Sequence, residues 1–175
     1  EDSAPSDTLL PAPGFAGADR PSDDQCFVQL NDSRPVSCEF GSDDDDAPRV
    51  ALIGDSHAYQ LLPTFQRMAE RNGWHLTTFF KGACPWNTTP LSTPGAFGAA
   101  CTDWREGVTS ALADREIDVV FTSALATTPY ASAGFDSSQE AAVAGYREAW
   151  SEMIDRGTPV VTVVDNPVWE TDPNK

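Results

Sequence analysis

Basic residues, histidines and long apolar runs are scarce in this chain, and each shortage excludes some classes of function. It has 11 lysines and arginines against 27 aspartates and glutamates, which gives a net charge of −16. Such a charge repels nucleic acid and anionic membrane surfaces, so we exclude nucleic-acid binding. No segment approaches the about 20 apolar residues of a membrane-spanning helix. Because the sequence has neither a signal-peptide pattern nor an initiating methionine, we expect it to be a piece of a longer protein.

Metal-ligand patterns are also missing. The four cysteines are Cys26, Cys38, Cys84 and Cys101. They include no Cys-x-x-Cys pair, and neither His57 nor His75 has metal-ligand spacing to a cysteine. The acidic run at 43–46 is typical of a solvated loop, and calcium binding is the weaker interpretation because the glycine and terminal glutamate of an EF-hand loop are absent. We therefore expect no metal and no cofactor.

The cysteines instead predict disulfides. An even number of well-separated cysteines without metal spacing is typical of two disulfides and of an oxidising compartment. Four cysteines allow three pairings, and proximity favours Cys26–Cys38 and Cys84–Cys101. In the chain-entropy model, each such loop stabilises the fold by about 3 kcal/mol.

The rest of the chain predicts one α/β domain. Residues 1–25 are rich in proline, alanine, serine, glycine and aspartate, which is typical of a linker or an extended arm. Residues 26–175 are expected to form the domain, beginning with a cysteine-bounded loop at 26–48. Apolar runs predict strands at 50–54, 75–80, 118–122 and 160–164, with helices between them. This alternation predicts a three-layer α/β/α fold with a parallel sheet.

Capping residues and spacing predict details of two helices. Asp103 with Glu106, and Ser137 with Glu140, resemble capping boxes that open helices. In the second helix, the residues expected to face the core are Val143, Tyr146, Trp150 and Ile154.

The segment most informative about function is Gly54-Asp55-Ser56, which lies between an apolar strand and a helical pattern. A serine on such a turn can be a nucleophile beside free backbone N–H groups. The simpler interpretation is that Ser56 only caps the helix, since Asp and Ser are preferred capping residues. The strand before the motif and the helix after it favour a catalytic serine. We expect the Val50–Gly54 strand to be central, with Ser56 accessible at its carboxyl end.

With three further motifs, the sequence resembles the SGNH (GDSL-like) hydrolase superfamily. More narrowly, it resembles the extracytoplasmic SGNH domain fused to integral-membrane acyltransferases of the acyltransferase family 3. The resemblance covers roughly residues 24–168 and rests on Gly54-Asp55-Ser56-His57-Ala58, Cys84-Pro85, Cys101 followed by Asp103-Trp104-Arg105, and Val164-Asp165-Asn166-Pro167. It implies the flavodoxin-like SGNH fold.

The resemblance also implies roles for individual residues. Ser56 would be the nucleophile, and its N–H and that of Gly82 would form the oxyanion hole. Many members place an asparagine after the third strand as another donor, whereas this strand runs into Thr122-Ser123-Ala124. Either Ser123 or Thr122 substitutes for the asparagine, or the hole uses backbone donors alone.

The general base is where the sequence departs from the superfamily. Members carry an Asp-x-x-His segment near the C-terminus, and this chain stops at Lys175 without one. The ring of His57 is expected to point away from the Ser56 hydroxyl and to form a supporting hydrogen bond or pack at the first helical turn. Asp55 is a second supporting candidate. His75 is expected at the opposite end of the sheet.

Two of the five tryptophans are candidate substrate contacts. Trp86 and Trp169 lie in loops after strands, where an indole face could stack on a sugar, although packing is an equally open role. Trp104 and Trp150 fit helix positions that face the core.

The leading hypothesis is an extracytoplasmic, serine-dependent O-acyl transferase or esterase domain, with acetyl as the expected group. The resemblance implies a surface glycan or glycolipid acceptor, and an acyl donor delivered by an upstream membrane acyltransferase domain to which the chain is tethered. The alternative is a non-catalytic carbohydrate- or partner-binding module with the same fold. A relative of plant-type polysaccharide O-acetyltransferases is a third interpretation, which the missing late Asp-x-x-His leaves unsupported.

Overall fold

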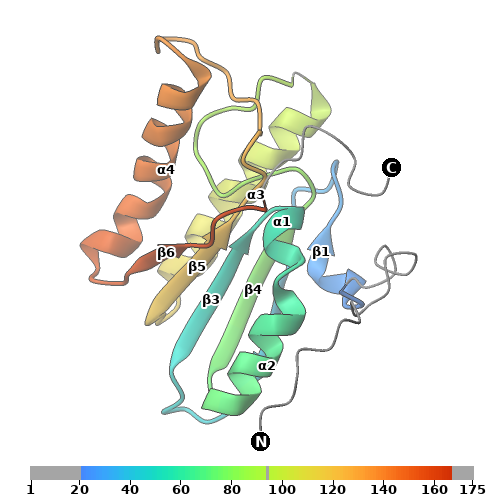
Figure 1. Ribbon diagram of the computed structural model, residues 1–175, viewed down its shortest axis with the longest axis vertical. Helices are drawn as coiled ribbons and strands as arrows, with labels where there is room; N and C mark the ends of the chain where they lie inside the picture. The colour runs from blue at the N-terminus through green and yellow to red at the C-terminus, as the bar shows by residue number, and fades with distance from the viewer. Residues whose placement is uncertain (1–20, 94, 167–175) are drawn as a thin grey trace, which may run out of the picture.

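A six-stranded sheet with helices on both faces forms the fold (Figure 1). The computed structural model describes residues 21–93 and 95–166. The strands are β1 (Phe27–Val28), β2 (Ser37–Gly41), β3 (Arg49–Gly54), β4 (His75–Lys81), β5 (Val119–Ser123) and β6 (Val160–Thr162). The helices are a 3-10 turn, η2 (Asp24–Cys26), and α1 (Ser56–Tyr59), α2 (Leu62–Asn72), α3 (Ala96–Ala113) and α4 (Ser138–Asp155).

Strand β3 is central, as the sequence predicts. The strand order is β1-β4-β3-β5-β6, and each neighbouring pair in this path is parallel. β2 adds an antiparallel strand along the outer edge of β4, and β1 takes over that edge at Phe80 and Lys81. Residues 26–48 therefore contribute two strands, where the sequence predicted only a loop. Their pairing partner, β4, lies 34 to 53 residues further on, so no local pattern signals it.

Side chains on the two faces of β3 pack into two separate hydrophobic cores, because alternate side chains of a strand point to opposite faces. On one face Leu52 packs with Phe65 of α2. On the other face Ile53 packs with Trp104 of α3 and Met153 of α4. Figure 1 shows α1 and α2 on the near face of the sheet, with α3 and α4 separate from them. No helix of the described residues is long and apolar enough to span a bilayer.

Both predicted disulfides are confirmed. Cys26–Cys38 ties η2 to β2, and Cys84–Cys101 ties the loop after β4 to α3. Each bond closes a local loop, with sequence separations of 12 and 17. The first bond fixes the edge of the sheet, and the second fixes the segment that follows β4 beside the expected site.

Helix starts and faces are only partly as predicted. The Ser137 cap is confirmed, since its Oγ accepts the N–H of Glu140 at 3.1 Å. The Asp103 capping box is wrong, because α3 already begins at Ala96 after Gly95, whose φ of 96° ends the preceding loop.

The predicted inner face of α4 is half right, because Trp150 packs against the core and Tyr146 is partly buried. The buried residues of this helix are Ala141, Gly145, Ala149 and Met153, whereas Val143 and Ile154 are exposed. The reason is a close approach: a Cβ on Gly145 would lie 2.1 Å from Asn87 Oδ1 and 2.2 Å from Thr89 Oγ1. Small residues therefore face inward and larger ones are displaced outward.

Candidate active site

Ser56 stands exposed on a sharp turn between β3 and α1. The turn depends on Gly54, whose φ is 153° and at which a Cβ would lie 2.0 Å from the carbonyl oxygen of Ser123. Asp55 follows as the N-cap, and its carboxylate accepts the N–H of His57 at 2.8 Å. Ser56 is thus the first residue of α1 and lies at the carboxyl end of the central strand, where parallel sheets place their sites.

The Gly82 N–H, which the resemblance implies as an oxyanion donor, is already hydrogen-bonded. The N–H of Gly82 donates to Val28 O at 2.9 Å, because the β1–β4 pairing continues one residue past β4. Gly82 therefore does not present this N–H to Ser56. Within the described part of the chain, the N–H groups of Ser56 and Ala83 have no hydrogen-bond acceptor. Ala83 also has a φ of 51°, the conformation that only a few per cent of non-glycine residues adopt.

Several donors on the β5 side of the site are already engaged. The hydroxyl of Ser123 donates to Val163 O at 2.9 Å. Leu125 N–H donates to Asp55 at 2.9 Å and Ala126 N–H donates to Asp165 at 2.8 Å, whereas Ala124 N–H has no acceptor among the described residues. Of the alternatives that the sequence left open, this geometry disfavours Ser123 and leaves Thr122 or backbone donors alone.

His57 is hydrogen-bonded to a residue from the far end of the chain. Its Nδ1 lies 2.5 Å from Asp165 Oδ1, beyond the end of β6. The Asp165 side chain is 3% exposed and the His57 side chain is 29% exposed. With the carboxylate as acceptor, Nδ1 carries the proton, and Nε2 is left without a partner among the described residues. Asp165 is therefore a functional candidate, and in the sequence it stands out only as part of the Val164-Asp165-Asn166-Pro167 motif.

The two carboxyl groups at this site have pKa values shifted in opposite directions. Burial raises the pKa of Asp55, although the amides of Leu125 and His57 oppose the shift. Burial also pushes the pKa of Asp165 upward, but hydrogen bonds from Ala126 N–H and His57 outweigh it and hold the pKa below its ordinary value. Asp165 is therefore the more firmly ionised partner for the His57 ring.

The tryptophans are mostly structural. Trp86 is 1% exposed and packs in the core between the sheet and α3, so its predicted role as a substrate contact is wrong. The Cys84–Cys101 disulfide draws its loop inward. Trp104 is fully buried and Trp150 packs partly buried against the same core. Trp169 lies outside the described residues.

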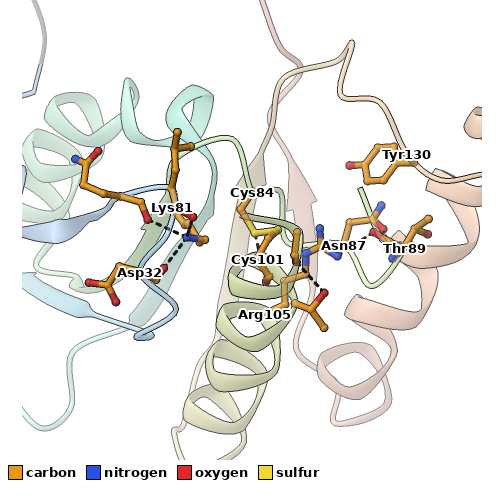
Figure 2. Close-up of a disulfide and its surroundings, with 12 residues drawn as sticks. Asp32, Lys81, Cys84, Asn87, Thr89, Cys101, Arg105 and Tyr130 are labelled. Atoms are coloured by element: carbon orange, nitrogen blue, oxygen red, sulfur yellow. Dashed lines mark hydrogen bonds between the residues drawn. A yellow bond between two sulfur atoms is a disulfide. The ribbon is translucent and has the colours of Figure 1, made fainter. Parts of the chain in front are cut away.

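Two buried cations flank that disulfide, and sequence reasoning missed both (Figure 2). Lys81 is 0% exposed, and its Nζ donates to the carbonyl oxygens of Gln29, Leu30 and Asp32 at 2.9, 2.8 and 2.6 Å. Arg105 donates to Thr89 O at 2.9 Å, and burial lowers its pKa to about 10. Both side chains therefore hold loops next to the site through carbonyl groups.

The fold and the Gly54-Asp55-Ser56 turn agree with a known family of domains. The parallel sheet presents Gly54-Asp55-Ser56 at the end of its central strand, as the resemblance to SGNH proteins implies. The chain belongs to the family of SGNH domains that are fused to AT3 domains, since the family model matches residues 22–175. No curated protein matches the chain.

A solved structure supports the fold. The periplasmic domain of the lipopolysaccharide acetyltransferase of Salmonella ser. Paratyphi A is similar, with a TM-score of 0.58 and 11% sequence identity. The similarity covers 72% of this chain and 48% of that one, so the chain spans about half the length of that domain.

Proposed function

We propose that this chain carries the serine nucleophile of an O-acyl transferase or esterase domain, with acetyl as the transferred group. The observation that carries the proposal is the exposed Ser56 at the carboxyl end of β3, together with the N–H groups of Ser56 and of Ala83, after the neighbouring strand β4, which have no acceptor among the described residues. Gly54 pairs with Phe80 in the parallel ladder, so the chain segments that hold these amides leave the sheet side by side. A tetrahedral oxyanion is stabilised by such a pair of fixed donors.

The proposed reaction has two steps. In the first, Ser56 Oγ attacks the acyl carbonyl of a donor, its proton passes to a base, and the donor's leaving group departs with a proton. In the second, a hydroxyl of the acceptor attacks the acyl-serine, gives its proton to the base and releases Ser56. With water as the acceptor, the same steps amount to ester hydrolysis.

Neither histidine of this chain is placed in an evident position to act as the general base for Ser56. The chain has two histidines, of which His57 is bound to Asp165 and His75 begins β4, at the amino end of the sheet. We propose that the Asp-x-x-His segment of related proteins supplies the base in a longer protein. A serine without its base loses about 10³-fold or more in rate.

Partners and location are part of the proposal. The family name associates such domains with AT3 domains, which supports an acyl donor delivered by a membrane acyltransferase. The similar solved domain is periplasmic and belongs to a lipopolysaccharide acetyltransferase. Together with the two disulfides, this supports an extracytoplasmic domain that acts on a surface glycan or glycolipid.

Hydrolysis of an activated acetyl ester tests the proposal. We expect low turnover by the 175-residue chain and much higher turnover by a longer form that includes an Asp-x-x-His segment. In the longer form, Ser56→Ala should abolish turnover, and Ser123→Ala should reduce it only modestly, because that hydroxyl already donates to Val163. Turnover that survives Ser56→Ala would reject Ser56 as the nucleophile, and a longer form with no turnover at all would favour the non-catalytic binding module.

A further inference from the structure

Two carboxylates hold two consecutive amides of the loop that follows β5. Asp55, at the end of β3, accepts Leu125 N–H on Oδ2 at 2.9 Å. Asp165, beyond the end of β6, accepts Ala126 N–H on Oδ2 at 2.8 Å. The loop is therefore fixed from both sides by strands that neighbour β5 in the sheet.

The same two carboxylates also hold His57, each with its other oxygen. Asp55 Oδ1 accepts the backbone N–H of His57 at 2.8 Å, and Asp165 Oδ1 accepts ring Nδ1–H at 2.5 Å. Each carboxylate thus bridges His57 to one amide of the loop. The four hydrogen bonds form a closed set that joins the ends of β3, β5 and β6 at the residue next to Ser56.

Burial makes this set rigid. Asp55 is 0% exposed and the Asp165 side chain is 3% exposed, so both carboxylates are largely shielded from bulk water. Hydrogen bonds to ionised groups are stronger than neutral ones, and a buried acceptor that loses its donor pays a desolvation cost. The His57 side chain is 29% exposed, so it can be changed with little disturbance of the core.

We propose that His57, oriented by Asp165, is a positioning residue that holds the Ser56 turn against the loop after β5. The inference rests on the proposed function for its catalytic consequence, but not for its geometry. Ser56 directly precedes His57, so the bonds to His57 restrain the backbone of Ser56 and with it the N–H proposed to face the oxyanion. The amides of Leu125 and Ala126 serve this restraint rather than the oxyanion.

A pair of variants separates the hydrogen bond from the ring. His57→Asn places a side-chain N–H close to where Nδ1 lies, and so can keep the bond to Asp165 without Nε2. His57→Phe keeps an aromatic ring and removes the donor. His75→Asn is the matched control, because His75 bonds to Ser42 O and Glu39 at the other end of the sheet.

Amide hydrogen exchange on the 175-residue chain tests the geometry without any catalysis. We expect His57→Phe to speed the exchange of Leu125 and Ala126 about tenfold or more, relative to Leu52 in the core of β3, because a bond to a charged acceptor is lost. We expect His57→Asn and His75→Asn to leave it within about threefold. Unchanged exchange at Ala126 in His57→Phe would overturn the restraint.

Ester hydrolysis by a longer, active form tests the consequence. We expect kcat to fall about tenfold or more in His57→Phe with KM little changed, and to be largely rescued in His57→Asn. If His57→Asn is as impaired as His57→Phe while exchange stays slow, Nε2 itself is required and the positioning role is overturned. If Ser56→Ala retains turnover, the proposed function fails, whereas the exchange results still decide whether the restraint exists.

Discussion

Gly82 N–H donates to the carbonyl oxygen of Val28 at 2.9 Å. Because of this bond, the first N–H after β4 that has no acceptor among the described residues is that of Ala83. Parallel pairing with β1 continues one residue beyond the strand and uses the donor that the motif suggests for catalysis. The next residue, Ala83, has a positive φ, and its N–H has no acceptor in the part of the chain that the structure describes. Backbone in a sparsely populated conformation is often found at functional sites.

The oxyanion donors can be identified by NMR of a boronic acid adduct of Ser56, which mimics the tetrahedral intermediate. We expect the amide resonances of Ser56 and Ala83 to shift strongly on adduct formation, because each N–H gains an anionic acceptor. The Gly82 amide should shift little, since its bond to Val28 is already made. The reverse pattern, with Gly82 shifted and Ala83 unmoved, would reassign the donor.

Gly54 should be intolerant of any side chain. Its added Cβ would lie 2.0 Å from Ser123 O and 2.8 Å from Ala58 Cβ, and the backbone of β5 cannot move away without breaking the sheet. We expect Gly54→Ala to lower the free energy of unfolding by about 3 kcal/mol. The control is Gly73→Ala, which also has a positive φ but no atom within 4 Å, and should cost about 1 kcal/mol. Urea denaturation of both variants would settle the comparison, and equal losses would contradict the steric argument.

Lys81 should contribute to stability through its three carbonyl partners. Lys81→Met keeps most of the buried stem but leaves the carbonyl groups of Gln29, Leu30 and Asp32 without their donor. We expect the free energy of unfolding to fall by about 3 kcal/mol. Arg67→Met, at an exposed position on α2, is the control and should change it by less than about 0.5 kcal/mol. If thermal unfolding shows that Lys81→Met is as stable as the original protein, water replaces the ammonium group at no cost in stability.

Asp165 should make the protein sensitive to acid. Its folded pKa lies below the ordinary value of 3.8, so the folded state binds fewer protons than the unfolded state in that range. The stabilisation from Asp165 is fully present above pH 3.8 and is lost as the pH falls through the folded pKa. Asp165→Asn should therefore be less stable at neutral pH and should lose less stability on acidification.

The measurement is the free energy of unfolding between about pH 6 and about pH 2.5. Asp55 has a pKa raised chiefly by burial, so its contribution has the opposite sign and is present in both proteins, although removal of the Asp165 charge also lowers the Asp55 pKa somewhat. Parallel pH curves for the two proteins would contradict the assignment of Asp165 as an ionised hydrogen-bond acceptor.

The sequence predicted those features that local residue types control. The apolar run of β3 and the Gly54-Asp55-Ser56 turn placed Ser56 at the carboxyl end of a central strand, because burial and turn chemistry act over a few residues. The disulfide pairing followed from short loops. The cap at Ser137 followed from a three-residue spacing.

Patterns failed where a distant segment changed the local preference. Apolar spacing suggested that Val143 and Ile154 face inward, but Asn87 and Thr89 approach Gly145 so closely that small residues form the inner face. Trp86 follows a strand, as many binding residues do, yet the neighbouring disulfide carries it into the core. Composition could not signal either contact.

By itself, the sequence determined the α/β fold, the place of Ser56 on it and the pairing of the two disulfides. Tertiary structure alone decided which groups surround Ser56. His57 meets Asp165 across 108 residues, and Lys81 meets the carbonyl of Asp32 across 49. Such partners come together only when strands far apart in the chain align in one sheet, because a polar group selects its partner by position in space and not by spacing in sequence.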